Sequence, residues 1–182
     1  MNENYPYYLA KFIGTIVDYV AHAGDSALDW YNSFGGNDYS SYDFAIVWLG
    51  TNGGLTNTSL TDITTNTGAY IAILDKLISD NANIKIALCN CHGSSGNLTT
   101  TNQMIDSISQ LSQYANNIIG VVDMFNSNLW SDEVTQLYHP NNGLHFSKVG
   151  NLHLANYVKD SINKLICDNE SMFNALVRGH GA

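Results

Sequence analysis

Residues 44–49 read FAIVWL, an uninterrupted apolar run that is followed at once by the turn-forming tetrapeptide GTNG. A short apolar run that stops at a glycine-rich turn is typical of a β-strand covered on both faces, as strands in parallel sheets are. Two similar runs follow along the chain, IKIALC at 84–89 and IIGVV at 118–122. The stretch TIVDYVA at 15–21 is rich in β-branched and aromatic residues and predicts a fourth strand.

Stretches with helical periodicity separate these runs. Helices are predicted over residues 7–13, 67–79, 101–114 and 147–167, with Ser147 as a suitable N-cap of the last one. Strands that alternate with helices favour a parallel sheet with helices on both faces. We therefore predict an α/β fold, a three-layer α/β/α sandwich with a mainly parallel sheet and flavodoxin-like layering.

Length and charge restrict the class of protein. The 182 residues, 45% of them hydrophobic, suit one domain with an ordinary core. Seven Lys and Arg face sixteen Asp and Glu, so the net charge of -9 would repel a phosphate backbone and excludes nucleic-acid binding. No apolar run approaches the roughly 20 residues of a membrane span. The first residues also lack the basic stretch that opens a signal peptide, and the sequence leaves the cellular location open.

The three cysteines do not suggest a disulfide framework. Cys89 and Cys91 are too close for an ordinary bridge and Cys167 is remote, so free thiols are predicted. The segment from Cys89 to His92 could suggest a metal, but no second pair of ligands at zinc spacing follows it. We therefore predict no metal site.

In parallel sheets, the chemistry gathers in loops beyond the carboxyl ends of the strands. The motif GTN closes the apolar run 44–49, and GLHFS at 143–147, with Gly150 beyond it, opens the last predicted helix. These two motifs, in this order and setting, resemble the third and fifth sequence blocks of the SGNH/GDSL hydrolases. The resemblance spans residues 5–165. With few charges and many Asn, Thr and Tyr residues, the chain looks most like SGNH domains of phage tail or host-recognition proteins.

The resemblance implies ester hydrolysis by a serine nucleophile and a histidine base, with fixed amide donors for the developing oxyanion. His145 matches the base, and Asn52 matches the oxyanion asparagine. The family pattern has an aspartate three residues before the histidine, where this chain has Asn142. An asparagine still accepts a hydrogen bond from the imidazole but cannot stabilise the imidazolium by charge, so the activity is expected to be impaired.

Two interpretations of the segment Gly24-Asp25-Ser26 remain open. It matches the first block literally, which makes Ser26 the nucleophile. Alternatively it belongs to the second block, in which Gly24 supplies an oxyanion amide and Ser26 caps a helix over residues 27–33. Only 26 positions separate Gly24 from Gly50, fewer than the helix and strand that normally lie between the first and third blocks of the family would need, which favours the second block. The usual nucleophile strand would then precede Met1, in an N-terminally truncated domain.

Together these features predict one SGNH-like domain over residues 1–182, with a C-terminal extension at 168–182. The expected function is hydrolysis of a small ester or an acylated glycan, by His145, Asn52, Gly24, Ser26 and Asn142. The resemblance implies no metal or organic cofactor, and it suggests part of a larger viral or multidomain protein, associated with a virion. The net charge and the lack of a long apolar run predict no nucleic-acid or membrane partner. The alternative is a catalytically inactive binding module of a phage tail or host-recognition protein.

Overall fold

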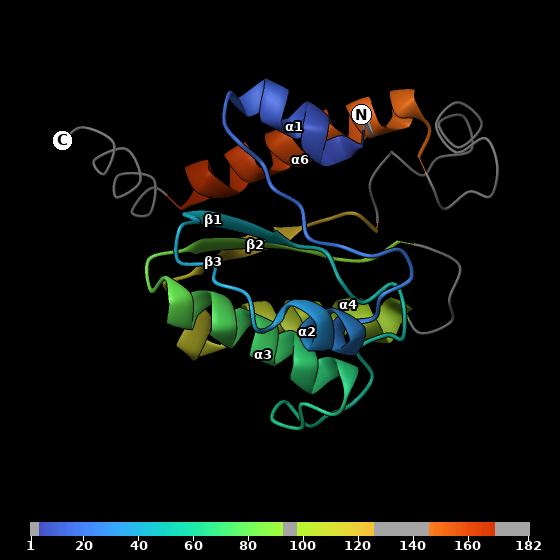
Figure 1. Cartoon of the computed structure of the whole chain (residues 1–182), viewed down its shortest axis with the longest axis vertical. Coiled ribbons are helices and arrows are strands. Elements are labelled where there is room, and N and C mark those ends of the chain that lie inside the picture. The colour runs from blue at the N-terminus through green and yellow to red at the C-terminus, as the bar shows by residue number, and fades with distance from the viewer. Residues whose placement is uncertain (1–3, 93–97, 126–145, 170–182) are drawn as a thin grey trace. The chain divides into compact units, whose positions relative to one another are not determined.

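The computed structural model describes residues 4–92, 98–125 and 146–169 (Figure 1). The chain divides into two compact units. Within the described ranges, one unit comprises residues 20–92 and 98–125, and the other comprises residues 4–19 and 146–169. None of the described helices is long and apolar enough to cross a membrane.

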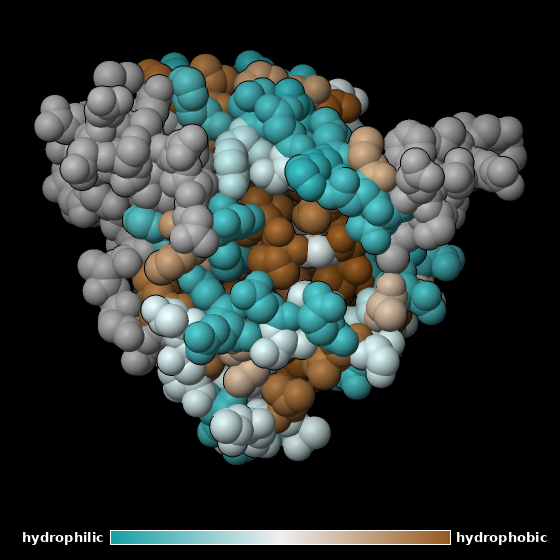
Figure 2. Space-filling view, turned by 180° about the vertical axis from the view of Figure 1, so that it is seen from behind, coloured by the Kyte–Doolittle hydropathy of each residue, from teal (hydrophilic) through white to brown (hydrophobic). Residues whose placement is uncertain are grey.

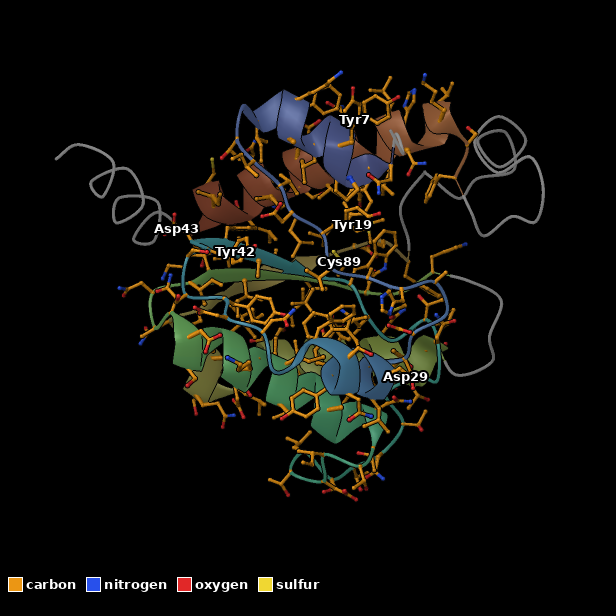
Figure 3. All side chains as sticks on the ribbon, viewed as in Figure 1. Tyr7, Tyr19, Asp29, Tyr42, Asp43 and Cys89 are labelled. Atoms are coloured by element: carbon orange, nitrogen blue, oxygen red, sulfur yellow. The ribbon has the colours of Figure 1, made fainter. Side chains whose placement is uncertain are left out.

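The larger unit contains a parallel sheet of three strands in the order β1-β2-β3. These strands are β1 (Phe44–Val47), β2 (Lys85–Cys89) and β3 (Ile118–Val122). They coincide with the three apolar runs, so the predicted α/β fold with a parallel sheet is confirmed. At the start of the sheet, the Lys85 N–H donates to the Asp43 carbonyl at 3.0 Å, and the Asn81 amide donates to the Tyr42 carbonyl at 3.0 Å. Figure 3 labels Tyr42 and Asp43 beside the start of β1.

Three helices of this unit lie along one face of the sheet (Figure 1): α2 (Ala27–Phe34), α3 (Asn66–Asp80) and α4 (Leu98–Ser109). Apolar side chains from these helices and from the strands form one buried core. The largest fully buried members include Tyr70, Leu74, Ile86, Leu88, Ile105 and Ile108. Burial of such side chains contributes about 1.5–3 kcal/mol each, so this core is the main source of the unit's stability.

The helix predicted over residues 101–114 is wrong in its bounds. α4 begins earlier, at Leu98, and ends at Ser109, and a separate 3₁₀ turn, η1 (Ser112–Tyr114), follows it. The backbone of Leu111 is extended, with φ -65° and ψ 125°, and this interrupts the helix. Tyr114 is buried, and its hydroxyl donates to Asp75 Oδ1 at 2.7 Å, so a contact with α3 holds the turn in place.

The strand predicted over residues 15–21 is also wrong. These residues have no regular secondary structure, and Ile16 is 86% exposed. A strand is stable only beside a neighbour that completes its hydrogen bonds, and the sheet in the described part of the chain has only the three strands given above. The Val20 carbonyl accepts a bond of 2.7 Å from the indole N–H of Trp30 on α2. High β-propensity alone therefore did not produce a strand here.

The smaller unit consists of α1 (Tyr5–Ile13) packed against α6 (Lys148–Asp168). The Gly150 N–H donates to Ser147 Oγ at 3.1 Å, so the predicted N-cap of the last helix is confirmed. Gly14 ends α1 in the left-handed conformation, with φ +69°. The Lys159 ammonium lies 5.5 Å from the centre of the Phe12 ring, which joins the exposed sides of the two helices.

The face seen in Figure 2 carries both polar and apolar residues, with apolar ones gathered at its centre. Among the described residues of the smaller unit, the exposed large apolar ones are Phe12, Ile13, Ile16, Tyr19, Val149 and Leu152. In the described part of the larger unit, Ile63 and Phe125 are also large, apolar and exposed. Single exposed apolar residues are ordinary on soluble domains and mark no site by themselves.

Candidate active site

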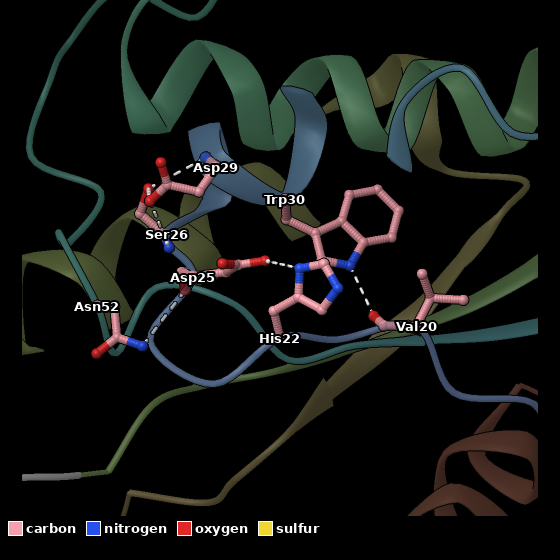
Figure 4. Close-up of polar contacts among 7 residues, drawn as sticks. All are labelled: Val20, His22, Asp25, Ser26, Asp29, Trp30 and Asn52. Atoms are coloured by element: carbon pink, nitrogen blue, oxygen red, sulfur yellow. Dashed lines mark hydrogen bonds and ion pairs between the residues drawn. The ribbon is translucent and has the colours of Figure 1, made fainter. Parts of the chain in front are cut away.

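A tight turn at residues 22–25 carries the glycine that sequence analysis singled out (Figure 4). The Asp25 N–H donates to the His22 carbonyl at 3.3 Å and closes this turn. Gly24 occupies the third position with φ +89°, a conformation that residues with a side chain rarely adopt. The glycine therefore allows the chain to reverse and brings the side chains of His22 and Asp25 together.

Ser26 follows the turn and caps α2. Its Oγ accepts the Asp29 N–H at 3.2 Å and donates to Asp29 Oδ2 at 2.6 Å, while the Ser26 N–H donates to the same carboxylate oxygen at 3.1 Å. This reciprocal pattern is a capping box. The bonds from Ser26 lower the pKa of the Asp29 carboxyl below its usual value. The helix-cap interpretation of Ser26 is confirmed, and α2 extends through Phe34.

The cap constrains any catalytic role for Ser26. Its hydroxyl hydrogen goes to a carboxylate, and no histidine in the described part of the chain hydrogen-bonds to it. A serine nucleophile needs a base that can take its proton, and a histidine is the usual partner. His145, the base expected for the literal first-block interpretation, lies outside the described residues, so the nucleophile role of Ser26 stays a prediction.

Asn52, in the loop after β1, reaches this turn from a distant part of the sequence. Its Nδ2 donates to the Asp25 carbonyl at 3.3 Å. The loop begins at Gly50, with φ +121°, where an added Cβ would lie 2.9 Å from Thr101 Cγ2. Glycine is therefore required for the loop to pass so close to α4. The structure thus brings Gly24, Ser26 and Asn52 into one surface cluster, which we call the turn cluster together with His22 and Asp25.

Gly53 and Asn66 connect the Asn52 loop to the start of α2. Asn66 Oδ1 accepts the N–H of Leu28 in the first turn of α2 at 3.1 Å. Gly53 has φ +74°, and a Cβ there would lie 2.4 Å from Asn66 Nδ2 and 3.1 Å from Ser26 Cβ. The loop after β1 therefore packs directly against the two residues that cap α2.

Hydrogen bonds from Cys91, which follows β2, and from Asn102 on α4 support the loop after β1. The Cys91 thiol donates to the Leu49 carbonyl at 3.4 Å, and the Asn102 side chain bonds both the N–H and the carbonyl of Cys91, at 2.7 and 2.9 Å. Asn90 Nδ2 donates to Asp123 Oδ1 at 3.0 Å and so joins the carboxyl ends of β2 and β3. Burial raises the pKa of the Cys91 thiol to about 11, so this thiol serves packing and not chemistry.

His22 is a member of the turn cluster that sequence analysis did not single out. Its Nδ1 lies 3.5 Å from Asp25 Oδ2, and its ring lies 4.7 Å from that of Phe34. The side chain of His22 is 64% exposed and that of Asp25 is 19% exposed. In the sequence, His22 stands at the end of a predicted strand, directly before Ala23 and Gly24, and this position could have marked it as a site residue. No motif around a single histidine there indicates which residue it pairs with.

Two predicted site residues, His145 and Asn142, lie outside the described residues. Their expected roles as base and as orienting residue stay predictions. The roles of Gly24, Ser26 and Asn52 in catalysis also stay predictions, although these residues lie together in the turn cluster. An exposed asparagine amide beside a glycine turn can donate to an anionic oxygen, which is the chemistry that an oxyanion site requires.

Comparison with known proteins defines the class of this fold. No protein-family model and no curated protein matches the chain. Solved structures do match, and they show that the fold is that of the SGNH hydrolases.

One similar structure is a Desulfitobacterium hafniense DCB-2 protein whose name places it in the lipolytic G-D-S-L family. It is 16% identical with a TM-score of 0.63, over 87% of this chain and 88% of that one. A possible lipase from Chitinophaga pinensis DSM 2588 is 17% identical with a TM-score of 0.62, over 88% of each chain. A Clostridium thermocellum family 3 carbohydrate esterase is 18% identical with a TM-score of 0.51, over 91% of this chain and 86% of that one.

Proposed function

We propose that this protein is an ester hydrolase of the SGNH type that removes small acyl groups from a carbohydrate or another small ester. The observation that carries the proposal is the contact of Asn52 Nδ2 with the carbonyl of Asp25, which holds the Asn52 amide beside the Gly24 turn on an SGNH fold. The likeness to a carbohydrate esterase supports a test on acylated glycans.

In the proposed reaction, the ester carbonyl binds with its oxygen toward two donors. One donor is the Asn52 side-chain amide. One of its two hydrogens goes to the Asp25 carbonyl, and the other is proposed to bond the ester oxygen. The second donor is the backbone N–H of Gly24. Donors fixed before the reaction stabilise the oxyanion without reorganising, and removal of one typically costs 10²–10³-fold in kcat, as a rough guide. His145 is the proposed base, oriented by Asn142, which accepts a hydrogen bond from the imidazole but supplies no charge.

The test measures hydrolysis of p-nitrophenyl acetate and of an acetylated oligosaccharide by the wild type and by Asn52→Ala, His145→Ala and Asn83→Ala. Asn83 is exposed in the turn before β2 and serves as the matched asparagine control. We expect Asn52→Ala to lower kcat by about 10²-fold, with Asn83→Ala unchanged. Absence of turnover by the wild type on both esters would overturn the proposal and favour the binding-module alternative, including its phage-tail setting.

A further inference from the structure

Thr101, near the start of α4, contacts both ends of the loop that carries Asn52. Its Oγ1 accepts the N–H of Leu55 at 2.9 Å, and both residues are buried. Its methyl group lies against Gly50, so close that a Cβ on that glycine would come within 2.9 Å of Thr101 Cγ2. One side chain therefore fixes where this loop begins and where it returns to the core.

The segment between these two points holds its shape weakly by itself. Gly53 and Gly54 both have positive φ, +74° and +67°, and glycine loses more conformational freedom on folding than any other residue. Asn52 is exposed, and its bond to the Asp25 carbonyl is long, at 3.3 Å (Figure 4). Because an exposed hydrogen bond exchanges readily with water, the position of the Asn52 amide depends on how firmly the ends of its loop are held.

The hydroxyl and the methyl group of Thr101 make separate contributions. A buried N–H that loses its acceptor keeps the cost of its burial, so without the hydroxyl the backbone at Leu55 would shift toward water. Valine at this position would keep the branched shape and the contact with Gly50 but would offer no acceptor. Serine would keep the acceptor and lose only the methyl group, so the two substitutions separate the hydrogen bond from the packing.

We propose that Thr101 is a positioning residue for ester hydrolysis, because it holds the loop that places the Asn52 amide before the ester binds. This inference rests on the proposed function, in which Asn52 donates to the oxyanion. Thr101 transfers no proton and acts through Asn52. Its contribution is to keep the donor fixed, since a donor that must first be ordered stabilises the transition state less than one already in place.

The first test measures hydrolysis of p-nitrophenyl acetate by Thr101→Val, Thr101→Ser and Thr67→Val. We expect Thr101→Val to lower kcat by about 10-fold with little change in KM, since an oxyanion donor acts mainly in the transition state. Thr101→Ser should stay within about 3-fold of the wild type, because serine still accepts the N–H of Leu55.

Thr67→Val is the matched control. Thr67 is also fully buried on a helix, α3, and its Oγ1 accepts the N–H of Asn57 at 3.2 Å. The substitution removes the same kind of hydrogen bond from the same connection, but beyond the segment that Thr101 holds. We expect its kcat to stay within about 3-fold of the wild type, whatever its effect on stability.

A double-mutant cycle shows whether Thr101 acts through Asn52. The cycle compares kcat of the wild type, Thr101→Val, Asn52→Ala and the double variant. Once the Asn52 amide is absent, its placement no longer matters, so adding Thr101→Val to Asn52→Ala should lower kcat no further. A general loosening of the fold would instead lower kcat by the same factor in both backgrounds.

NMR reads the loop without turnover. The backbone order parameter of Asn52 should be about 0.85 in the wild type and in Thr67→Val, and should fall below about 0.6 in Thr101→Val. Hydrogen exchange of the wild type needs no variant. The N–H of Leu55 should be protected in the native protein, and exchange as fast as that of an exposed loop would overturn the inference.

The outcomes separate the inference from the function on which it rests. An active wild type whose kcat is unchanged in Thr101→Val overturns the inference alone. Equal losses from Thr101→Val with and without the Asn52 side chain also overturn it, while ester hydrolysis stands. A wild type without turnover on any ester overturns both.

Discussion

Substitution of Gly53 by alanine tests how the turn cluster is assembled. Gly53 has φ +74°, where an alanine costs about 1–2 kcal/mol in backbone strain. The new Cβ would also lie 2.4 Å from Asn66 Nδ2, far inside van der Waals contact. Asn66 must then move and release the N–H of Leu28, a hydrogen bond worth about 0.5–1.5 kcal/mol. We expect the free energy of unfolding to fall by about 2–3 kcal/mol.

The matched control is Gly14→Ala, because it has nearly the same backbone conformation without the collision. Gly14 has φ +69°, and nothing lies within 4 Å of an added Cβ. Urea unfolding followed by circular dichroism gives the free energy for each variant. Gly14→Ala should show the strain alone, about 1–2 kcal/mol, and Gly53→Ala should exceed it by about 1 kcal/mol.

A double-mutant cycle with Asn66→Ala identifies the cause. Truncation of Asn66 removes the collision at 2.4 Å and leaves the contact with Ser26 Cβ at 3.1 Å, so the cost of Gly53→Ala should then fall toward that of Gly14→Ala. Equal losses for the two glycine variants in the wild-type background would refute the reasoning. So would a cost of Gly53→Ala that Asn66→Ala leaves unchanged.

Three further predictions concern the cap of α2 and the thiols. Ser26→Ala should lower the free energy of unfolding by about 1 kcal/mol in urea titrations, and an unchanged midpoint would contradict the capping box. Because Ser26 lowers the pKa of Asp29 in the folded state, the stability that this bond contributes is complete above the usual value of 3.8. It is lost as pH falls through the lowered pKa, so wild type and Ser26→Ala should converge in acid unfolding curves. A thiol reagent should modify the exposed Cys167 in the native protein, but Cys89 and Cys91, which are buried, only after denaturation.

Much of the fold could be predicted from the sequence, because its signals are local. The runs at 44–49, 84–89 and 118–122 are apolar on both faces and coincide with the strands of a parallel sheet. The caps formed by Ser26 and Ser147 are also local, since each serine bonds a backbone N–H three residues ahead. Strand and cap signals of this kind need no knowledge of distant residues.

The strand predicted over 15–21 shows where local signals fail. Its composition favours extended backbone, but a strand also requires a neighbour with free hydrogen-bonding groups. Whether that neighbour exists is decided by the arrangement of the whole sheet. Composition alone could not supply that information.

The turn cluster was decided by tertiary structure. Asn52 lies 27 positions from Asp25, and their contact depends on glycines that let the loop after β1 pack against α4 and the start of α2. The pairing of His22 with Asp25 depends in turn on the reversal at Gly24 and on the Phe34 ring of α2. A sequence motif specifies which groups are present, whereas their distances follow from packing between segments far apart in the chain, where many weak contacts act together.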